Sequence, residues 1–277
     1  MLRDPTESPA QRILITTLGD YRHLMECPIP SSALVDVLDE FDLSNDAARK
    51  ALSTLTKRGY LSRSKNGRET AYELSHLGRK LVSEASERIM DFGSPREWNG
   101  LWTAVAFSIE ESLRHKRQPL RSALRALGFG PLYDGLWIAA YGESKDVEAV
   151  LADLEIDDAT LFHGQFRLTP AKVAKLHDSW GLDEVREQYE AFLGSFTHFK
   201  DKLDRQELSP TAAFVLRTNL MDAWRVFPRI DPELPAPLEP QDWPRGKAKE
   251  LFAKIYAETS KTAELKFASL VGVSGSG

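Results

Sequence analysis

The stretch SNDAARKALSTLTKRGYLSRSKNGRETAYELS, residues 44–75, decides the fold of this chain. Its first part predicts a helix that Ser44 caps. Alanine and leucine recur on one face of that helix, and Gly59 stands where a left-handed C-cap belongs. The period then changes to that of two strands, over residues 60–64 and 70–74, separated by an Asn-Gly turn. A capped helix followed by such a hairpin is typical of the second half of a winged helix-turn-helix.

The flanking sequence supplies the other helices that this fold needs. Apolar periodicity predicts helices over residues 9–20 and 31–41, the second capped by Ser31. After the hairpin, Ser75 is expected to cap a further helix that runs to about Met90. The order of helices, short turn, capped helix and hairpin therefore predicts a winged helix-turn-helix.

The helix that begins at Ser44 has a face suited to double-stranded DNA. If Ala48, Leu52 and Leu55 point inward, the opposite face is polar and basic, and a helix of this kind fits the major groove. Arg49 is expected to pair with a base edge, whereas the neighbouring cations contact phosphates and set position without reading sequence. The predicted DNA-binding residues are Ser44, Asn45, Arg49, Lys50, Ser53, Lys57 and Arg58 on the helix, with Lys65 and Arg68 on the hairpin.

Charge is distributed unevenly along the chain. The whole sequence carries a net charge of -5, which taken alone argues against nucleic acid as a partner. Residues 44–80, however, hold nine lysines or arginines against three acidic residues, a net charge of +6. This basic block favours DNA binding. The alternative is a winged helix with a solvated basic face that binds another protein.

Beyond a linker at residues 91–95 the pattern becomes mixed. Strands and helices alternate from Trp102 to Leu168, which predicts an α+β sandwich of ferredoxin-like type. The remainder is helical, with a proline-rich crossing at residues 228–244. We therefore expect an α+β protein with three domains: a winged helix-turn-helix DNA-binding domain, a ferredoxin-like (Cas2-like) central domain and a helical C-terminal effector or dimerisation domain, at residues 1–91, 92–170 and 171–277.

Catalysis has weak support in the sequence. A Cas2-like, metal-dependent nuclease would need a carboxylate near the end of its first strand, and residues 102–109 contain none, although Glu110 and Glu111 follow directly. The six histidines are scattered and Cys27 is the single cysteine, so no metal site and no internal disulfide are expected. No secretion signal or membrane span is evident, and we expect a cytoplasmic protein without a catalytic cofactor.

Several short motifs resemble the PaaX family of phenylacetic-acid-pathway repressors. The resemblance covers nearly the whole chain in order. It departs at Tyr60, where the family commonly has Trp, and at Asn99, where it commonly has Asp. The segments that carry it are residues 48–61, 67–68, 72–75, 98–102, 127–132, 135–138, 234–235 and 242–244.

This resemblance implies a bacterial transcriptional repressor of an aromatic catabolic operon. It implies a homodimer on a palindromic operator, released by an aryl- or acyl-coenzyme A thioester, phenylacetyl-CoA in the namesake. Such an effector carries phosphates and an apolar acyl end, so its site is expected to pair cations with aromatic walls. The helix at residues 211–227 offers candidates for effector binding: Arg217, Trp224 and Arg225.

Overall fold

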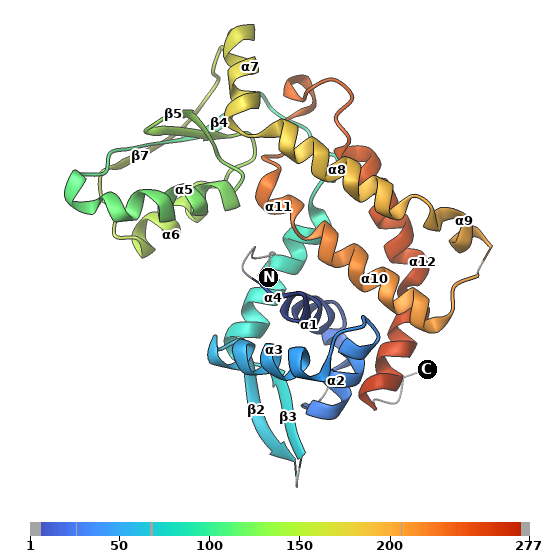
Figure 1. Cartoon of the computed structure of the whole chain (residues 1–277). Helices are drawn as coiled ribbons and strands as arrows, with labels where there is room; N and C mark the ends of the chain where they lie inside the picture. The colour runs from blue at the N-terminus through green and yellow to red at the C-terminus, as the bar shows by residue number, and fades with distance from the viewer. Residues whose placement is uncertain (1–6, 26, 67–68, 206, 273–277) are drawn as a thin grey trace. The chain divides into compact units, whose positions relative to one another are not determined.

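The computed structural model describes residues 7–25, 27–66, 69–205 and 207–272 (Figure 1). The chain folds into two compact units, each built from segments that are far apart in the sequence. Unit 1 consists of Met1–Asp91, Phe192–Val226 and Lys249–Gly277, and unit 2 of Phe92–Ala191 and Phe227–Ala248. The division into three domains, at residues 1–91, 92–170 and 171–277, remains a prediction from the sequence.

Unit 1 opens with a winged helix. Its strands form a three-stranded antiparallel sheet in the order β1-β3-β2. Ile29 on β1 pairs with Tyr72 on β3, an addition that the sequence pattern did not predict because β1 has only two residues. The elements in chain order are α1 (Pro9–Asp20), η1 (Arg22–Leu24), β1 (Ile29–Pro30), α2 (Ser31–Asp39), α3 (Asn45–Lys57), β2 (Leu61–Asn66), β3 (Glu69–Leu74) and α4 (His76–Asp91).

Local capping sets most helix ends in unit 1. The Ser44 hydroxyl accepts from the Ala47 amide at 3.3 Å, and the Ser75 hydroxyl accepts from the Gly78 amide at 2.9 Å, as predicted. Gly59 has a φ of 76° and ends α3 in the left-handed conformation. The cap predicted at Ser31 is wrong, because Pro30 occupies the cap position of α2 without a side-chain hydrogen bond.

The core of unit 1 joins the winged helix to C-terminal helices. Leu14 of α1 and Leu52 of α3 share one buried cluster with Phe214 of α10 (Pro210–Trp224) and Phe267 of α12 (Arg245–Val271). The short α9 (Phe199–Asp204) precedes α10. Because α1 packs on both α3 and α10, the winged helix is not an independent module.

Unit 2 contains a four-stranded antiparallel sheet in the order β5-β6-β4-β7. Its chain order, strand-helix-strand-strand-helix-strand, is that of a ferredoxin-like sandwich. The sequence pattern missed β5, whose four residues begin Gly-Pro. The elements are β4 (Trp102–Phe107), η2 (Glu111–Lys116), α5 (Arg117–Ala126), β5 (Gly130–Tyr133), β6 (Leu136–Ala139), α6 (Ser144–Asp153) and β7 (Ala159–Gly164).

Both faces of this sheet are covered. Val105 and Trp137 pack with α5 and α6 on one face, while Trp102 and Ile138 pack on the other with Leu182 and the helix before it. That second layer consists of α7 (Pro170–Ser179), the start of α8 (Leu182–Phe196) and the segment around η3 (Ala236–Leu238). The short α11 (Phe227–Ile230) contacts α5.

Two helices of unit 2 begin without a side-chain cap. Ser144 does not cap α6, because it is the first helical residue and its hydroxyl lies 2.8 Å from Nε2 of His163. The 3₁₀ segment η2 directly precedes α5, and Lys116 occupies the cap position of α5. Within the described residues, no helix combines the length and the apolar character that a bilayer span requires.

Candidate nucleic-acid interface

The outer face of α3 carries the predicted DNA-binding residues. Its phase is set by Ala48, Ala51, Leu52 and Leu55, which are all buried in the core of unit 1. Every predicted contact on this helix is exposed, and among the described residues no ion pair involves its cations. The exposed residues are Ser44, Asn45, Arg49, Lys50, Ser53, Lys57 and Arg58.

Internal hydrogen bonds already use some of the polar groups on this helix. The Ser44 hydroxyl serves as the N-cap, and the hydroxyl of Thr54 donates to the Lys50 carbonyl at 2.9 Å. The guanidinium of Arg49 and the ammonium groups of Lys50 and Lys57 have no such partner in the described part of the chain, so they are available to an external anion.

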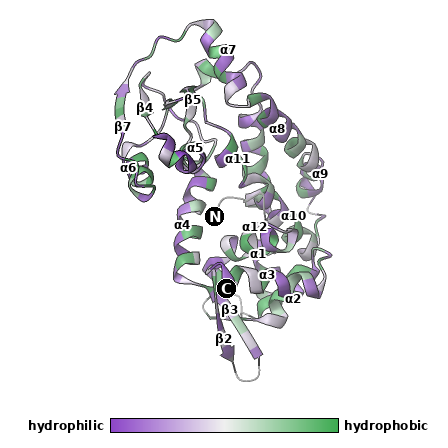
Figure 2. Ribbon diagram, turned by 60° about the vertical axis from the view of Figure 1, so that its left-hand side comes forward, coloured by the Kyte–Doolittle hydropathy of each residue, from purple (hydrophilic) through white to green (hydrophobic). Residues whose placement is uncertain are grey.

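The hairpin of β2 and β3 adds a second polar surface in unit 1. Residues 62–65 of β2 are all exposed, and Figure 2 shows this strand as predominantly hydrophilic. Lys65 pairs in register with Thr70 near the tip. The predicted contact Arg68 lies outside the described residues. Sequence reasoning missed Arg63, which is exposed on β2 and has its guanidinium 3.4 Å from the Thr70 hydroxyl.

The residues predicted to bind an effector lie in the interior of unit 1, and their role in effector binding stays a prediction. Arg217 and Arg225 are each 2% exposed, and Trp224 is fully buried. Arg217 donates from Nε to Asp20 at 2.9 Å, and Trp224 donates from Nε1 to the Ile89 carbonyl at 3.1 Å. All three side chains therefore have hydrogen-bond partners within the protein. Cations and aromatic residues at helical spacing, the pattern on which the prediction rested, also occur in helices whose arginines form buried ion pairs.

These buried arginines tie α1 to α10. Asp222 accepts from Arg12 at 3.2 Å, from Thr16 at 3.4 Å and from Arg225 at 3.1 Å. Arg225 also donates to Glu7 at 3.1 Å. Breaking a buried pair by removing one partner is costly, so α1 is held firmly between α3 and the C-terminal helices.

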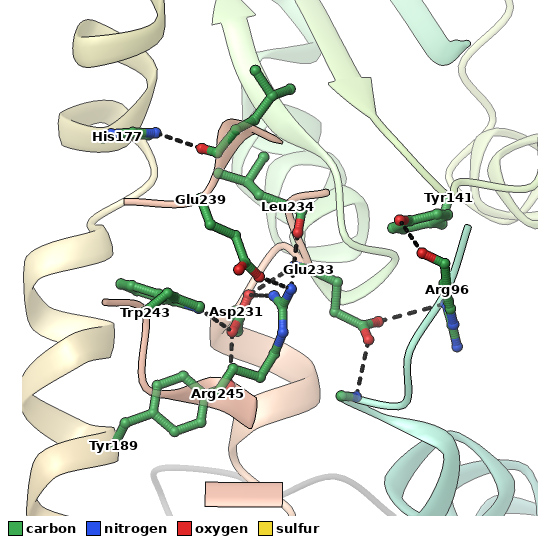
Figure 3. A network of polar contacts seen from close by, with 12 residues as sticks. Arg96, Tyr141, His177, Tyr189, Asp231, Glu233, Leu234, Glu239, Trp243 and Arg245 are labelled. Carbon is green, nitrogen blue, oxygen red and sulfur yellow. Dashed lines mark hydrogen bonds and ion pairs between the residues drawn. The ribbon is translucent and has the colours of Figure 1, made fainter. Parts of the chain in front are cut away.

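Unit 2 has its own polar centre, which surrounds the buried Asp231 (Figure 3). Its carboxylate accepts from the Tyr189 hydroxyl at 2.7 Å, from Arg245 at 3.0 Å and from the Trp243 indole at 3.4 Å. Arg245 also pairs with Glu239. Burial, together with the Asp231 carboxylate, raises the pKa of Tyr189 well above its ordinary value, so its hydroxyl stays a hydrogen-bond donor. The network fastens the proline-rich crossing to α8 and α12.

A second branch of this network reaches the segment that leads into β4. Glu233 accepts from the Gly93 amide at 3.2 Å and lies 3.7 Å from the guanidinium of Arg96. The Arg96 carbonyl in turn accepts from the Tyr141 hydroxyl at 3.3 Å. All these groups are paired within unit 2, which is the arrangement of a structural clamp.

A metal centre is not formed by the described residues, where no group of three or more His, Cys, Asp or Glu side chains is close enough to hold an ion. The β4 strand, Trp102–Phe107, contains no carboxylate. The metal-dependent nuclease considered as an alternative would need such a ligand set, and the described residues do not form one.

Comparison with known proteins matches three family segments in chain order. Residues 9–78 match PaaX-like protein, residues 95–176 match the PaaX protein central Cas2-like domain, and residues 180–269 match the PaaX-like protein C-terminal domain. The chain belongs to the PaaX-like family. This confirms the α+β fold class with its winged-helix N-terminal part, Cas2-like centre and helical C-terminal part.

One curated relative in this PaaX-like family is the transcriptional repressor PaaX of Escherichia coli (strain K12). It is 29% identical over 247 residues, which cover 87% of this chain and 77% of that protein. Among solved structures, the uncharacterized protein Rv0674 from Mycobacterium tuberculosis matches with a TM-score of 0.59 at 21% identity. That match covers 90% of this chain and 96% of the other, and shows the shared fold.

The three family segments are distributed unequally over the two compact units of the structure. The N-terminal segment lies in unit 1 and the Cas2-like segment in unit 2, whereas the C-terminal segment contributes to both. Specifically, α10 packs in the winged-helix core, and Asp231 organises the clamp in unit 2.

Proposed function

We propose that this protein is a bacterial transcriptional repressor that binds an operator through α3 and the hairpin of unit 1. The observation that carries the proposal is the outer face of α3, where cations stand exposed over a buried apolar stripe. Membership of the PaaX-like family, which includes a transcriptional repressor, supports it. A protein with this role works in the compartment of the chromosome, which is the cytoplasm.

The proposed complex is a homodimer on a palindromic operator. A two-fold symmetric protein presents two α3 helices, and each is expected to enter a major groove at half-sites about one helical turn, or a multiple of it, apart. Arg49 is proposed to read a base edge, while Lys50, Lys57 and Arg58 contact phosphates. Lys65, with Arg63, extends the basic surface along the hairpin.

The proposed signal is an aryl- or acyl-coenzyme A thioester that relieves repression of an aromatic catabolic operon. The thioester can release DNA only to the extent that it binds the DNA-incompetent conformation better than the competent one. The shared core of α1, α3 and α10 gives a route by which such a difference can reach α3.

A mobility-shift titration of the full chain on DNA upstream of its own gene tests the DNA-binding proposal. Arg49→Ala should weaken operator binding by about 1–3 kcal/mol and relax discrimination at one position, if Arg49 reads a base. Lys50→Ala should weaken binding to operator and random DNA alike. Lys261→Ala, which removes an exposed cation from α12, is the matched control and should bind as the wild type does.

The outcome also separates the proposal from a winged helix that binds protein. Equal, weak binding of wild type to operator and random duplexes would contradict the repressor function. A thermal-shift screen of acyl-CoA thioesters tests the effector class separately, because a ligand of the native state raises the melting temperature. No shift with any thioester would refute the effector while leaving operator binding intact.

A further inference from the structure

A cavity of about 250 Å³ lies inside unit 1, between the winged helix and the C-terminal helices. Its apolar wall comes from three helices: Ile15 of α1, Val82 and Ile89 of α4, and Met221 of α10. These four side chains are at most 7% exposed, whereas Met90 beside them is 41% exposed. The interior of the cavity thus combines this apolar wall with buried polar groups such as Thr16 and Arg225, and the cavity meets solvent on the side of Met90.

The charged groups that line this cavity fall into two classes. Asp20 is paired with Arg217, and Arg225 with Asp222 and Glu7, while the imidazole of His23 lies 3.6 Å from Glu264, so these groups have partners within the protein. Arg22 is different, because in the part of the chain that the structure describes no carboxylate forms an ion pair with it. Its guanidinium donates to the Gly19 carbonyl at 2.9 Å and to the Ser86 hydroxyl at 3.0 Å, which holds it at the cavity between α1 and α4.

The size and lining of the cavity define the chemistry of an occupant. An engineered apolar cavity of about 150 Å³ binds benzene, so this one has room for an aromatic ring with a short substituent, but not for a nucleotide as well. A guanidinium without a carboxylate partner attracts an anion and fits a carboxylate or phosphate in two-pronged geometry. The complementary ligand has a compact aryl body with negative charge beside it.

We propose that this cavity is the site at which the effector acts, and that it takes a compact aryl group whose attached anion lies against Arg22. The inference rests on the proposed function, and it places the signal next to the DNA-binding helices. In a free aryl acid the anion is the carboxylate next to the ring. In a carrier thioester the pantetheine arm separates the phosphates from the ring, so the thioester carbonyl oxygen takes the place at Arg22 and the phosphates lie outside the cavity. The aryl group in the cavity is common to both.

The walls of the cavity explain how an occupant would act on DNA binding. Ile15, Thr16 and Gly19 line it from α1, the helix that also packs on α3. Val82 and Ser86 line it from α4, which follows the hairpin directly. A ring that fills the space pushes on both helices, and it shifts the population toward the arrangement that accommodates it.

Calorimetric titration of the full chain locates the ligand. The probes are phenylacetate, phenylacetyl-CoA, coenzyme A alone, and phenethylamine as a cation with a similar body. We expect one or both aryl anions to bind and phenethylamine not to bind. Phenylacetate binding alone identifies the free acid as the source, and phenylacetyl-CoA binding without coenzyme A binding identifies the thioester.

Three variants test the position of the site. Val82→Phe places a ring where the ligand ring would lie and should weaken binding at least about tenfold, and Arg22→Ala should weaken it about tenfold by removing the charged donor. Lys261→Ala is the matched control and should bind the probe as the wild type does. Arg22 is exposed, so its variant keeps the test valid if Val82→Phe fails to fold.

Operator binding without ligand is measured for each variant, which separates the two proposals. A wild type that binds operator but none of the aryl anions overturns the cavity proposal and leaves the repressor function standing. Unchanged probe affinity in folded Val82→Phe or in Arg22→Ala overturns it as well. Loss of specific operator binding in the wild type contradicts the proposed function instead, whatever the titration shows.

Discussion

Several buried carboxylates in this protein are stabilised by hydrogen bonds and ion pairs with buried side chains. Asp231 is the clearest case, because it is 3% exposed and accepts hydrogen bonds from three side chains of unit 2 and from the Glu233 amide. The interior of unit 1 uses the same device at Asp20 and Asp222. Arg217 on α10 and Arg225 directly after it thus have internal partners, whereas Arg49 on α3 forms no ion pair among the described residues.

Asp231→Ala should lower the free energy of unfolding by about 3–5 kcal/mol, because it leaves the Arg245 guanidinium and the Tyr189 hydroxyl without their buried acceptor. Urea unfolding monitored by tryptophan fluorescence measures the change. Glu190→Ala, an exposed change on α8 beside Tyr189, is the control and should stay within about 0.5 kcal/mol of wild type. Equal stabilities for the two variants would show that the clamp contributes little.

The two residues that depart from the family pattern keep their structural roles. The Asn99 side chain accepts from the Leu101 amide at 2.9 Å, a turn that an aspartate makes equally well. Tyr60 packs against the core of unit 1, where an aromatic ring is what the position requires. Neither difference changes the fold.

At the scale of elements, the junction between the hairpin and α4 determines where the hairpin points. The Ser75 amide donates to the Tyr60 carbonyl at 3.0 Å, and the Ser75 hydroxyl donates to the Gly59 carbonyl. Gly78 lies so close to this turn that a Cβ there would stand 2.2 Å from the Tyr60 carbonyl oxygen. Backbone contact at this distance requires glycine.

Gly78→Ala should therefore destabilise unit 1 by about 1–3 kcal/mol, since the added methyl meets backbone that cannot move aside cheaply. Gly194→Ala on α8 is the opposite case, because a Cβ there has no atom within 4 Å. Alanine favours the helix at that position by about 0.5–1 kcal/mol. Melting temperatures of the two variants should move in opposite directions, and a shift in the same direction would contradict the packing at Gly78.

For the whole molecule, charge must be considered by region and not as a sum. The chain has a net charge of -5, yet residues 44–80 carry +6. The affinity of this block for a DNA duplex should fall steeply as the salt concentration rises, because each neutralised phosphate releases counterions on binding. If the proposed dimer makes about six phosphate contacts, operator affinity should fall about a thousandfold between 50 and 200 mM salt.

Fluorescence anisotropy with a labelled operator at several salt concentrations measures this slope. Lys57→Ala should reduce the slope, because it removes a phosphate contact from each subunit, while Arg205→Ala on the segment after α9 should leave it unchanged. A wild-type affinity that does not vary with salt would contradict phosphate binding by α3.

Much of the architecture was determined locally. Capping at Ser44, the positive φ of Gly59 and the buried stripe of α3 depend on neighbouring residues, so a single sequence predicted them and the helix face they expose. Periodicity also gave the order of strands and helices in the central domain. The short strands β1 and β5 were missed, because strands of two and four residues carry too little alternation to detect.

Only the tertiary structure decided which distant groups meet. Nothing local distinguishes Arg49, which is exposed, from Arg217, which pairs with Asp20 from another part of the chain. The cavity beside Val82 likewise exists only because α1, α4, α10 and α12 pack together. The physical reason is that capping and periodicity depend on short-range interactions, whereas burial, ion pairing and cavities depend on contacts between segments far apart in the sequence.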